Sequence, residues 1–213
     1  MFRGLTCLLV SGVVSLAGCG DDGTSPEDEL TVADELTMEE VQFMADLIDA
    51  TSSGILDDFF DSSGGDPTTA PALTHGPVVW TRTFVRSRPC HDRGMLTVVG
   101  TTGTSVWDAA AVTYDVDGSG TKNRTDCTYT RGDGVQITLD GDADWTHERH
   151  YLNYAPTGTW ITTYVGGYVW TKGTGESDSC TYSLTRTVDT AMNTRTLTGT
   201  SCGNDINRSD TWR

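Results

Sequence analysis

Apolar residues follow a helical period in one early segment of the chain. Within residues 37–60 they recur at spacings of three, four and seven, and this period predicts an amphipathic helix. The apolar stripe consists of Val41, Met44, Ile48, Ile55 and Phe59, and the aspartates lie mostly off it. Thr37 followed by Glu40 has the form of a capping box, which places the start of the helix at Thr37. Residues 51–54 are weak helix formers, so two shorter helices are the alternative.

From residue 78 onward the period changes to two, and threonine, tyrosine and tryptophan become frequent, which favours strands. The predicted strands are residues 78–86, 95–100, 105–116, 123–130, 135–145, 159–165, 168–172, 180–188, 194–202 and 206–212. The predicted breaks are residues 101–104, 117–121, 132–134, 173–178 and 189–193. Gly166 and Gly167 are also compatible with a bulge inside one long strand.

Short breaks make neighbouring strands pair in antiparallel fashion. Eight to ten strands exceed what one flat sheet carries comfortably. The sequence therefore predicts an all-β domain over residues 78–213, an antiparallel meander that closes as a barrel or a sandwich. A short amphipathic helix precedes it, and residues 61–77 form a loop between the two.

The N-terminus has the pattern of a secretory signal, with Arg3, an apolar run over residues 5–17 and small residues before a cysteine. Leu16-Ala17-Gly18-Cys19 resembles the lipobox of bacterial lipoproteins. The resemblance implies that residues 1–18 are a cleaved signal peptide and that the sulfur of Cys19 carries the lipid anchor. The apolar run is too short for a transmembrane helix.

Within the lipoprotein pattern, an Asp after the lipidated cysteine can retain the protein in the inner membrane. This chain has Gly20 there, so the resemblance leans toward the outer membrane. It implies an exported protein held in the cell envelope, with the lipid bilayer as a partner through the acyl anchor. The chain is similar in this respect to small Gram-negative envelope lipoproteins.

The net charge of −16 is concentrated near the N-terminus. Residues 21–66 contain fifteen acidic and no basic residues, whereas residues 67–213 contain fifteen acidic and thirteen basic residues. A nucleic-acid-binding protein would need a basic stripe, so this class is excluded. Residues 19–36 are predicted to be an acidic, lipidated linker that holds the folded domain away from the bilayer.

Four cysteines remain after Cys7 is removed with the signal peptide and Cys19 is lipidated, namely Cys90, Cys127, Cys180 and Cys202. Disulfides persist in exported chains. Cys180 and Cys202 are symmetric about Ala191, and a turn there would place them on adjacent strands. This favours Cys180–Cys202 and leaves Cys90–Cys127, among three connectivities. A metal site is the alternative, although no close C-x-x-C spacing is present.

One segment resembles the twelve-residue calcium loop of EF-hand proteins. The residues that match its ligands are Asp115, Asp117, Ser119, Thr121 and Asp126, with Gly120 at the sharp turn. Asp in place of the closing Glu, Lys122 in place of an apolar residue and strand-like flanks depart from the pattern. A hairpin turn is therefore favoured over a calcium site.

Other chemistry is sparse. Asp140, Asp142 and Asp144 share one face of a predicted strand, which is more often a solvated face than a cation site. His147 and His150 point to opposite faces at strand spacing. Because no nucleophile and base form a catalytic motif, the sequence predicts a binding or structural module with an envelope protein as partner, rather than an enzyme. The alternatives are a barrel that carries a small apolar ligand and a hydrolase with scattered acids.

Overall fold

The computed structural model describes residues 36–64, 81–108, 113–153 and 155–211 of the 213-residue chain. All of these residues belong to one compact unit, residues 33–213. The signal segment, the lipobox with Cys19, nearly all of the acidic linker and most of the predicted 61–77 loop lie outside the described residues, so their assignment stays a prediction.

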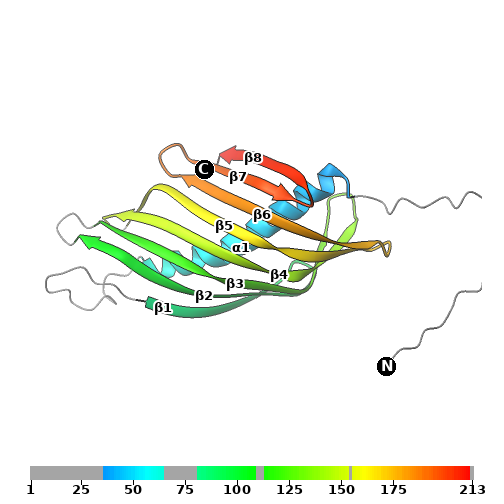
Figure 1. Cartoon of the computed structure of the whole chain (residues 1–213), viewed down its shortest axis with the longest axis horizontal. Helices are drawn as coiled ribbons and strands as arrows, with labels where there is room; N and C mark the ends of the chain where they lie inside the picture. Colours follow the sequence, from blue (N-terminus) through cyan, green and yellow to red (C-terminus); the bar gives the residue numbers. More distant parts are fainter. Residues whose placement is uncertain (1–35, 65–80, 109–112, 154, 212–213) are drawn as a thin grey trace, which may run out of the picture. The chain divides into compact units, whose positions relative to one another are not determined.

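One helix and eight strands make up the described residues. They are α1 (Met38–Gly64), β1 (Thr81–Pro89), β2 (Arg93–Asp108), β3 (Thr113–Thr130), β4 (Gln136–Leu152), β5 (Ala155–Lys172), β6 (Ser177–Asp189), β7 (Thr194–Ser201) and β8 (Asn204–Thr211). The strands form one antiparallel sheet in chain order, β1 to β8, and α1 lies across one face of it (Figure 1).

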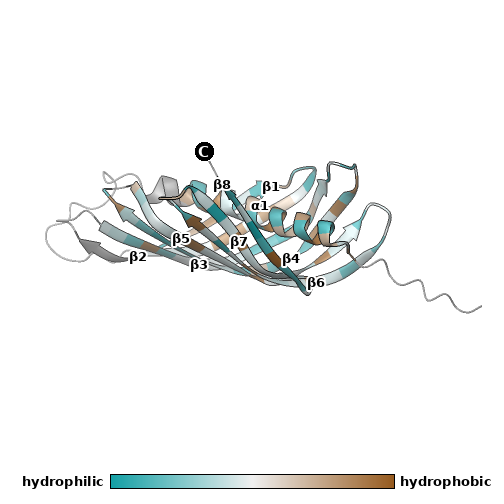
Figure 2. Ribbon diagram, turned by 90° about the horizontal axis from the view of Figure 1, so that it is seen from above, coloured by the Kyte–Doolittle hydropathy of each residue, from teal (hydrophilic) through white to brown (hydrophobic). Residues whose placement is uncertain are grey.

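The predicted all-β meander with an N-terminal helix is confirmed, but the predicted closure is not. In the described residues β1 and β8 are the two edges of a single sheet, so the sheet neither closes as a barrel nor folds into a sandwich. The physical reason is that α1 buries the sheet's apolar face without a second sheet. Figure 2 shows the sheet curving along α1.

The capping box predicted at the start of α1 is confirmed. The Thr37 N–H donates to Glu40 Oε2 (2.9 Å), and the Glu40 N–H donates to Thr37 Oγ1 (3.2 Å). The helix runs without interruption through residues 51–54 and ends at Gly64 rather than at residue 60. Its whole predicted stripe is buried, from Val41 to Phe59.

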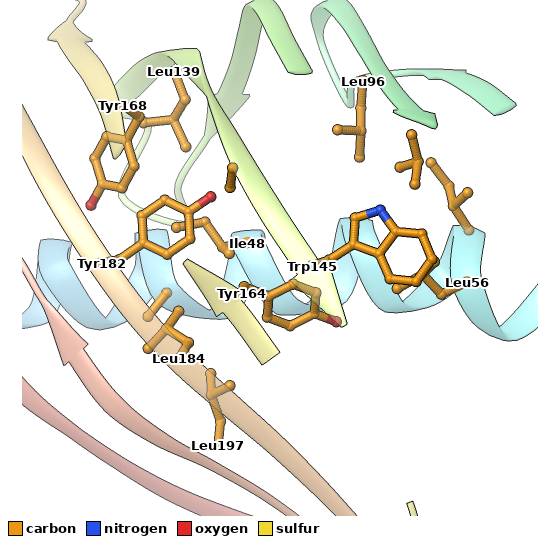
Figure 3. Close-up of a cluster of buried hydrophobic side chains, with 14 of the residues drawn as sticks. Ile48, Leu56, Leu96, Leu139, Trp145, Tyr164, Tyr168, Tyr182, Leu184 and Leu197 are labelled. Carbon is orange, nitrogen blue, oxygen red and sulfur yellow. The ribbon is translucent and has the colours of Figure 1, made fainter. Parts of the chain in front are cut away.

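We call the face of the sheet that packs on α1 the inner face, and the opposite one the outer face. Trp145 of β4, Tyr164 of β5 and Leu184 of β6 lie on the inner face over Ile48 and Leu56 of α1 (Figure 3). The described tyrosines are buried in the same core cluster, so these aromatic side chains form core rather than a ligand-binding surface.

Two predicted strand breaks, residues 101–104 and 117–121, are wrong, because β2 and β3 run straight through them. Gly100 and Gly120 are cross-strand partners, and Trp145 of β4 pairs with Gly120. A Cβ on Gly100 would overlap the indole of Trp145, and one on Gly120 would overlap the Val99 carbonyl. These glycines therefore make room inside long strands instead of forming turns.

The other three breaks are turns, as predicted. Asp189 Oδ1 accepts hydrogen bonds from the N–H groups of Ala191 and Met192, and Asn193 adopts a φ of 50°. Gly134 adopts a φ of 88° in the turn between β3 and β4, which favours glycine. The long strand β5 passes through Gly166 and Gly167 without a loop.

Both predicted disulfides are present. Cys180 pairs with Cys202 at a Cα–Cα distance of 4.8 Å, and Cys90 pairs with Cys127 at 5.3 Å. The first joins β6 to the turn after β7, and the second joins the β1–β2 turn to β3. Each therefore fixes a turn to a neighbouring strand.

Candidate functional site

Opposite charges meet where α1 packs on the sheet. The helix contains seven acidic and no basic residues. Ten of the thirteen basic residues in 67–213 interact with α1 through ion pairs, hydrogen bonds or ring contacts. They are Arg82, Arg86, Arg88, Lys122, Arg124, Arg131, Arg149, Lys172, Arg186 and Arg208. The folded domain therefore directs most of its positive charge toward its own helix.

Asp57 is the centre of this interface. Its carboxylate accepts hydrogen bonds from Arg149 Nη2 (2.9 Å), Arg186 Nη2 (3.0 Å) and Arg186 Nη1 (3.4 Å). The Arg149 side chain is fully buried, and its guanidinium lies 3.6 Å from the centroid of the Trp160 ring. A buried guanidinium needs both a counter-charge and hydrogen-bond acceptors, and Asp57 supplies both.

The N-terminal end of α1 is held by a second set of ion pairs. Glu40 lies 3.1 Å from Lys172 Nζ and 3.7 Å from Arg131 Nη1, and Glu39 lies 3.1 Å from Arg131 Nη2. These carboxylates also lie in the first helical turn, where the helix dipole favours negative charge. Ion pairs thus fix the helix at its start and, through Asp57, near its end.

Between these two sets lies an uncommon pair, Ser52 of α1 and Lys122 of β3. Lys122 Nζ donates to Ser52 Oγ at 2.9 Å and lies 3.9 Å from the centroid of the Tyr164 ring. Burial, helped by the charge of Arg124, holds the pKa of Lys122 well below its usual value. A serine next to a lysine of lowered pKa is the arrangement of a Ser–Lys nucleophile and base.

Access argues against catalysis at Ser52. Ser52 and Lys122 are each 1% exposed, and neither lines any of the pockets described for this part of the chain. Arg124 Nη2 also donates to Ser52 Oγ, at 3.3 Å. In this structure Ser52 therefore connects the helix to Lys122 and Arg124 of β3.

The acidic and neutral groups beside this pair are also perturbed by burial. Burial raises the pKa of Asp49, although Arg186 opposes this, and Asp49 accepts a long hydrogen bond of 3.5 Å from the Tyr164 hydroxyl. Burial, together with Arg149 and Arg186, lowers the pKa of His147 well below its usual value. His147 is therefore neutral in the folded protein near pH 7.

The outer face of the sheet has a different composition. Directly paired residues form one row of small polar side chains across all eight strands, Thr83, Thr101, Ser119, Thr146, Thr163, Thr185, Thr198 and Asn207. Exposed aliphatic side chains lie on β1, β2 and β5, namely Val85, Val99, Ile161, Val165 and Val169. Val165 is 53% exposed, which is unusual for valine in a central strand.

The structure does not bring the five predicted calcium ligands together. Asp115, Asp117, Ser119 and Thr121 alternate along β3 with buried inner-face residues, and Asp126 follows at a bulge before Cys127. At strand rise, Asp115 and Asp126 are about 36 Å apart along β3. The loop that would be needed for a shared ion is replaced by an extended strand.

The aspartates of β4 and the two histidines follow the sequence-based prediction. Asp142 and Asp144 are exposed and Asp140 is partly exposed, while Ala143 between them is buried. His147 lies on the inner face, and His150 faces Asp115 at 2.6 Å on the other side. Within the described ranges, no three His, Cys, Asp or Glu side chains are grouped closely enough to hold a metal ion.

Sequence reasoning missed the ionic interface, because the helical period places Asp49 outside the apolar stripe of the helix. Asp49 is in fact 4% exposed and packs against the sheet with that stripe. One signal was available in the strands. Lys122, Arg124, Arg149 and Arg186 occupy inward positions of the period-two pattern, where apolar residues are expected. Basic residues at inward-facing positions of a strand predict that an acidic helix or strand packs against that face of the sheet.

The chain matches no protein-family model, no curated protein and no solved structure. As for the membrane, no helix in the described part of the chain is long and apolar enough to span one.

Proposed function

We propose that this protein is an envelope-anchored binding module that acts through the outer face of its sheet. The observation that supports this proposal best is the difference between the two faces. The inner face is covered by α1, and its basic side chains form ion pairs with acidic residues of the helix. The outer face instead presents hydroxyl, carboxylate and aliphatic side chains. Exposed aliphatic groups among polar ones are typical of interaction surfaces.

The anchor is proposed to be the lipid on Cys19, in the outer membrane, with the acidic linker as a spacer. This part rests on the lipobox alone. A Cys19→Ser variant should leave the membrane fraction and appear as a soluble, folded protein. Cys19→Ser protein that still sediments with membranes would contradict the lipid anchor.

Envelope crosslinking tests the binding surface. A photo-crosslinking amino acid is placed at Val165 on the outer face and, in a matched control, at the exposed position Ala50 on α1. We expect a discrete covalent adduct with an envelope protein from position 165 and none from position 50. No adduct at position 165, or equal adducts at both, would contradict the proposal.

A carrier of a small apolar ligand inside a barrel is the weaker candidate. In such carriers the ligand occupies the barrel interior. Here Ile48, Leu56 and Phe59 of α1 occupy the corresponding face and are buried against the sheet. Mass spectrometry of gently purified protein tests this candidate, since a ligand held there should co-purify.

A further inference from the structure

Two arginines on the edge strand β1 lack a counter-charge. Arg82 and Arg86 are exposed, and their guanidinium carbons lie 5.7 and 5.9 Å from the centroid of the Phe59 ring of α1. Apart from one long hydrogen bond from Arg86 to the Val85 carbonyl (3.4 Å), neither side chain has a polar partner in the described residues. A ring contact leaves most N–H groups of a guanidinium able to donate elsewhere.

The opposite edge of the sheet, β8, pairs its charges within the protein. Arg208 lies 3.0 Å from Asp46 of α1, and Asp210 pairs with Arg195 of β7. Unpaired arginines are therefore a property of β1 and not of both edges. An acidic group from another molecule would complete the interactions of these arginines.

The backbone of β1 is also open on one side. This strand pairs with β2 over all nine residues from Thr81 to Pro89, and it is the first strand of the sheet (Figure 1). No other described strand pairs with its far side. Alternate residues of such an edge direct their N–H and C=O groups outward, where a further strand can bond them. Addition of a strand to an open edge is a common mode of peptide recognition.

The positions of the two arginines determine the spacing of the acidic residues in such a strand. Arg82, Phe84 and Arg86 form one row on the inner side of β1, where all three contact Phe59. Directly opposite residues of paired strands have Cβ atoms about 4.5–5.5 Å apart, which is close enough for an ion pair. Two acidic residues four positions apart would lie opposite the arginines, and an apolar residue midway between them would lie opposite Phe84.

The segments of this chain do not meet that requirement. No two acidic residues within residues 19–36, or within residues 61–77, are four positions apart. The acidic residues of β8, Asp205 and Asp210, are five positions apart and so point to opposite faces. The β1 edge of a second copy carries the same positive charge and would be repelled. The charge and the spacing therefore favour a different protein.

We propose that the open edge of β1 binds an extended acidic segment of a partner protein by strand addition, with the pattern acidic–x–apolar–x–acidic. The acidic side chains pair with Arg82 and Arg86, and the main chain pairs with the outward N–H and C=O groups of β1. This edge does not include Val165, so the proposal is independent of binding through the outer face.

The test uses the purified protein and the synthetic peptide Thr-Glu-Thr-Val-Thr-Glu-Thr. The control peptide, Thr-Glu-Thr-Val-Glu-Thr-Thr, has the same composition, but its glutamates are three positions apart and point to opposite faces. Binding is followed by amide chemical shifts. We expect saturable binding of the first peptide, with the largest changes at amides of β1 rather than β8, and binding at least about threefold weaker for the control.

Matched variants test the arginines. The double variant Arg82→Gln, Arg86→Gln should weaken the first peptide about three- to thirtyfold, the range for two exposed ion pairs. Arg93→Gln removes an exposed arginine from β2 and should change the affinity less than about twofold. Because all three side chains are exposed, the variants should keep the melting temperature of the parent protein.

N-methylated peptides test strand addition itself. Methyl groups on the amides of peptide positions 2, 4 and 6 block one side of the strand, and methyl groups at positions 3, 5 and 7 block the other. One pattern should abolish binding and the other should not. Four results would each overturn the proposal: no saturable binding up to about 10 mM, equal affinity for the two unmethylated peptides, equal effects of the two methylation patterns, or unchanged affinity in the double arginine variant.

Discussion

Neighbouring aspartates of α1 give a matched test of the ionic interface. Asp57→Asn and Asp58→Asn are the same chemical change one residue apart, with the same loss of charge. Asp57 is 27% exposed and pairs with Arg149 and Arg186, whose side chains are 0% and 8% exposed. Asp58 is 71% exposed and pairs with Arg88, which is 50% exposed. Only burial and partners differ between the two variants.

The expected magnitudes follow from these exposures. Removing one partner of a buried ion pair costs about 3–5 kcal/mol, because the remaining charge stays buried without compensation. Asparagine retains one acceptor oxygen, so we expect about 2–4 kcal/mol for Asp57→Asn. An exposed pair contributes about 0–1 kcal/mol, so Asp58→Asn should cost less than about 1 kcal/mol.

Urea unfolding measures the difference. With a slope of about 2 kcal/mol per molar urea, Asp57→Asn should lower the unfolding midpoint by about 1–2 M. Asp58→Asn should lower it by less than about 0.5 M. Equal shifts for the two variants would refute the conclusion that α1 is held by buried charge. A lower unfolding midpoint for Asp58→Asn alone would contradict the conclusion that Asp57, and not Asp58, holds α1 to the sheet.

Three further predictions concern other parts of the fold. In the unfolded chain His147 is protonated near pH 6.5, whereas burial and the charges of Arg149 and Arg186 keep its pKa well below that value in the folded protein. The free energy of unfolding should therefore fall as the pH drops below about 6.5. A His147→Gln variant should lose this pH dependence, which is measured as the urea midpoint at a series of pH values. The raised pKa of Asp49 has the opposite effect, since it favours the folded state as the pH falls, so an unchanged slope in His147→Gln would contradict the assignment to His147. Gly120→Ala should lower the melting temperature by about 5 °C, because its Cβ would overlap the Val99 carbonyl, whereas Gly132→Ala in an open turn should change it by less than about 2 °C; equal melting temperatures would count against the close packing of β2 and β3. Replacing Cys180 and Cys202 together by serine opens a 22-residue crosslink and should cost about 3 kcal/mol in chemical unfolding, and an unchanged midpoint would show that the pair is not oxidised.

Local signals in the sequence were sufficient for the helix start and for three turns. The Thr37–Glu40 capping box and the Asp189 turn each depend on contacts between residues no more than three positions apart. A short stretch of sequence is therefore sufficient to predict them. The Cys180–Cys202 pair was also predictable, since the turn after Asp189 brings β7 back along β6 and so places Cys202, just after β7, close to Cys180.

Long-range packing explains the features that were missed. Glycines have the sequence appearance of turn residues, but Gly100 and Gly120 pair with each other inside β2 and β3, where the absence of a side chain leaves room for Trp145 and for the Val99 carbonyl. The segment that resembles a calcium loop was misleading for the same reason: its glycines lie inside an extended strand, so the predicted ligands are spread along β3. A turn motif and a glycine-lined strand are alike in sequence and differ in their neighbours.

The open sheet has a similar origin. Strand number and pattern predicted that the sheet would close on itself, because long unprotected edges are unfavourable. The structure protects its apolar face with α1 and keeps charged residues on its edges, with Arg82, Arg86 and Arg88 on β1 and Asp205 and Asp210 on β8. Charged residues in a strand do not by themselves show, from the sequence, that the strand will lie at the edge of the sheet.

Hydrogen exchange of the α1 amides tests the central claim, that this acidic helix is an integral part of the sheet's core, most directly. In the intact protein, the amides of Asp49, Ser52 and Leu56 should exchange only through global unfolding, with the same free energy as amides in β4 and β5. If these helical amides exchange with a free energy several kcal/mol lower than those of the strands, α1 detaches on its own. The inner face would then be open to a ligand, and the claim that α1 belongs to the core would be contradicted.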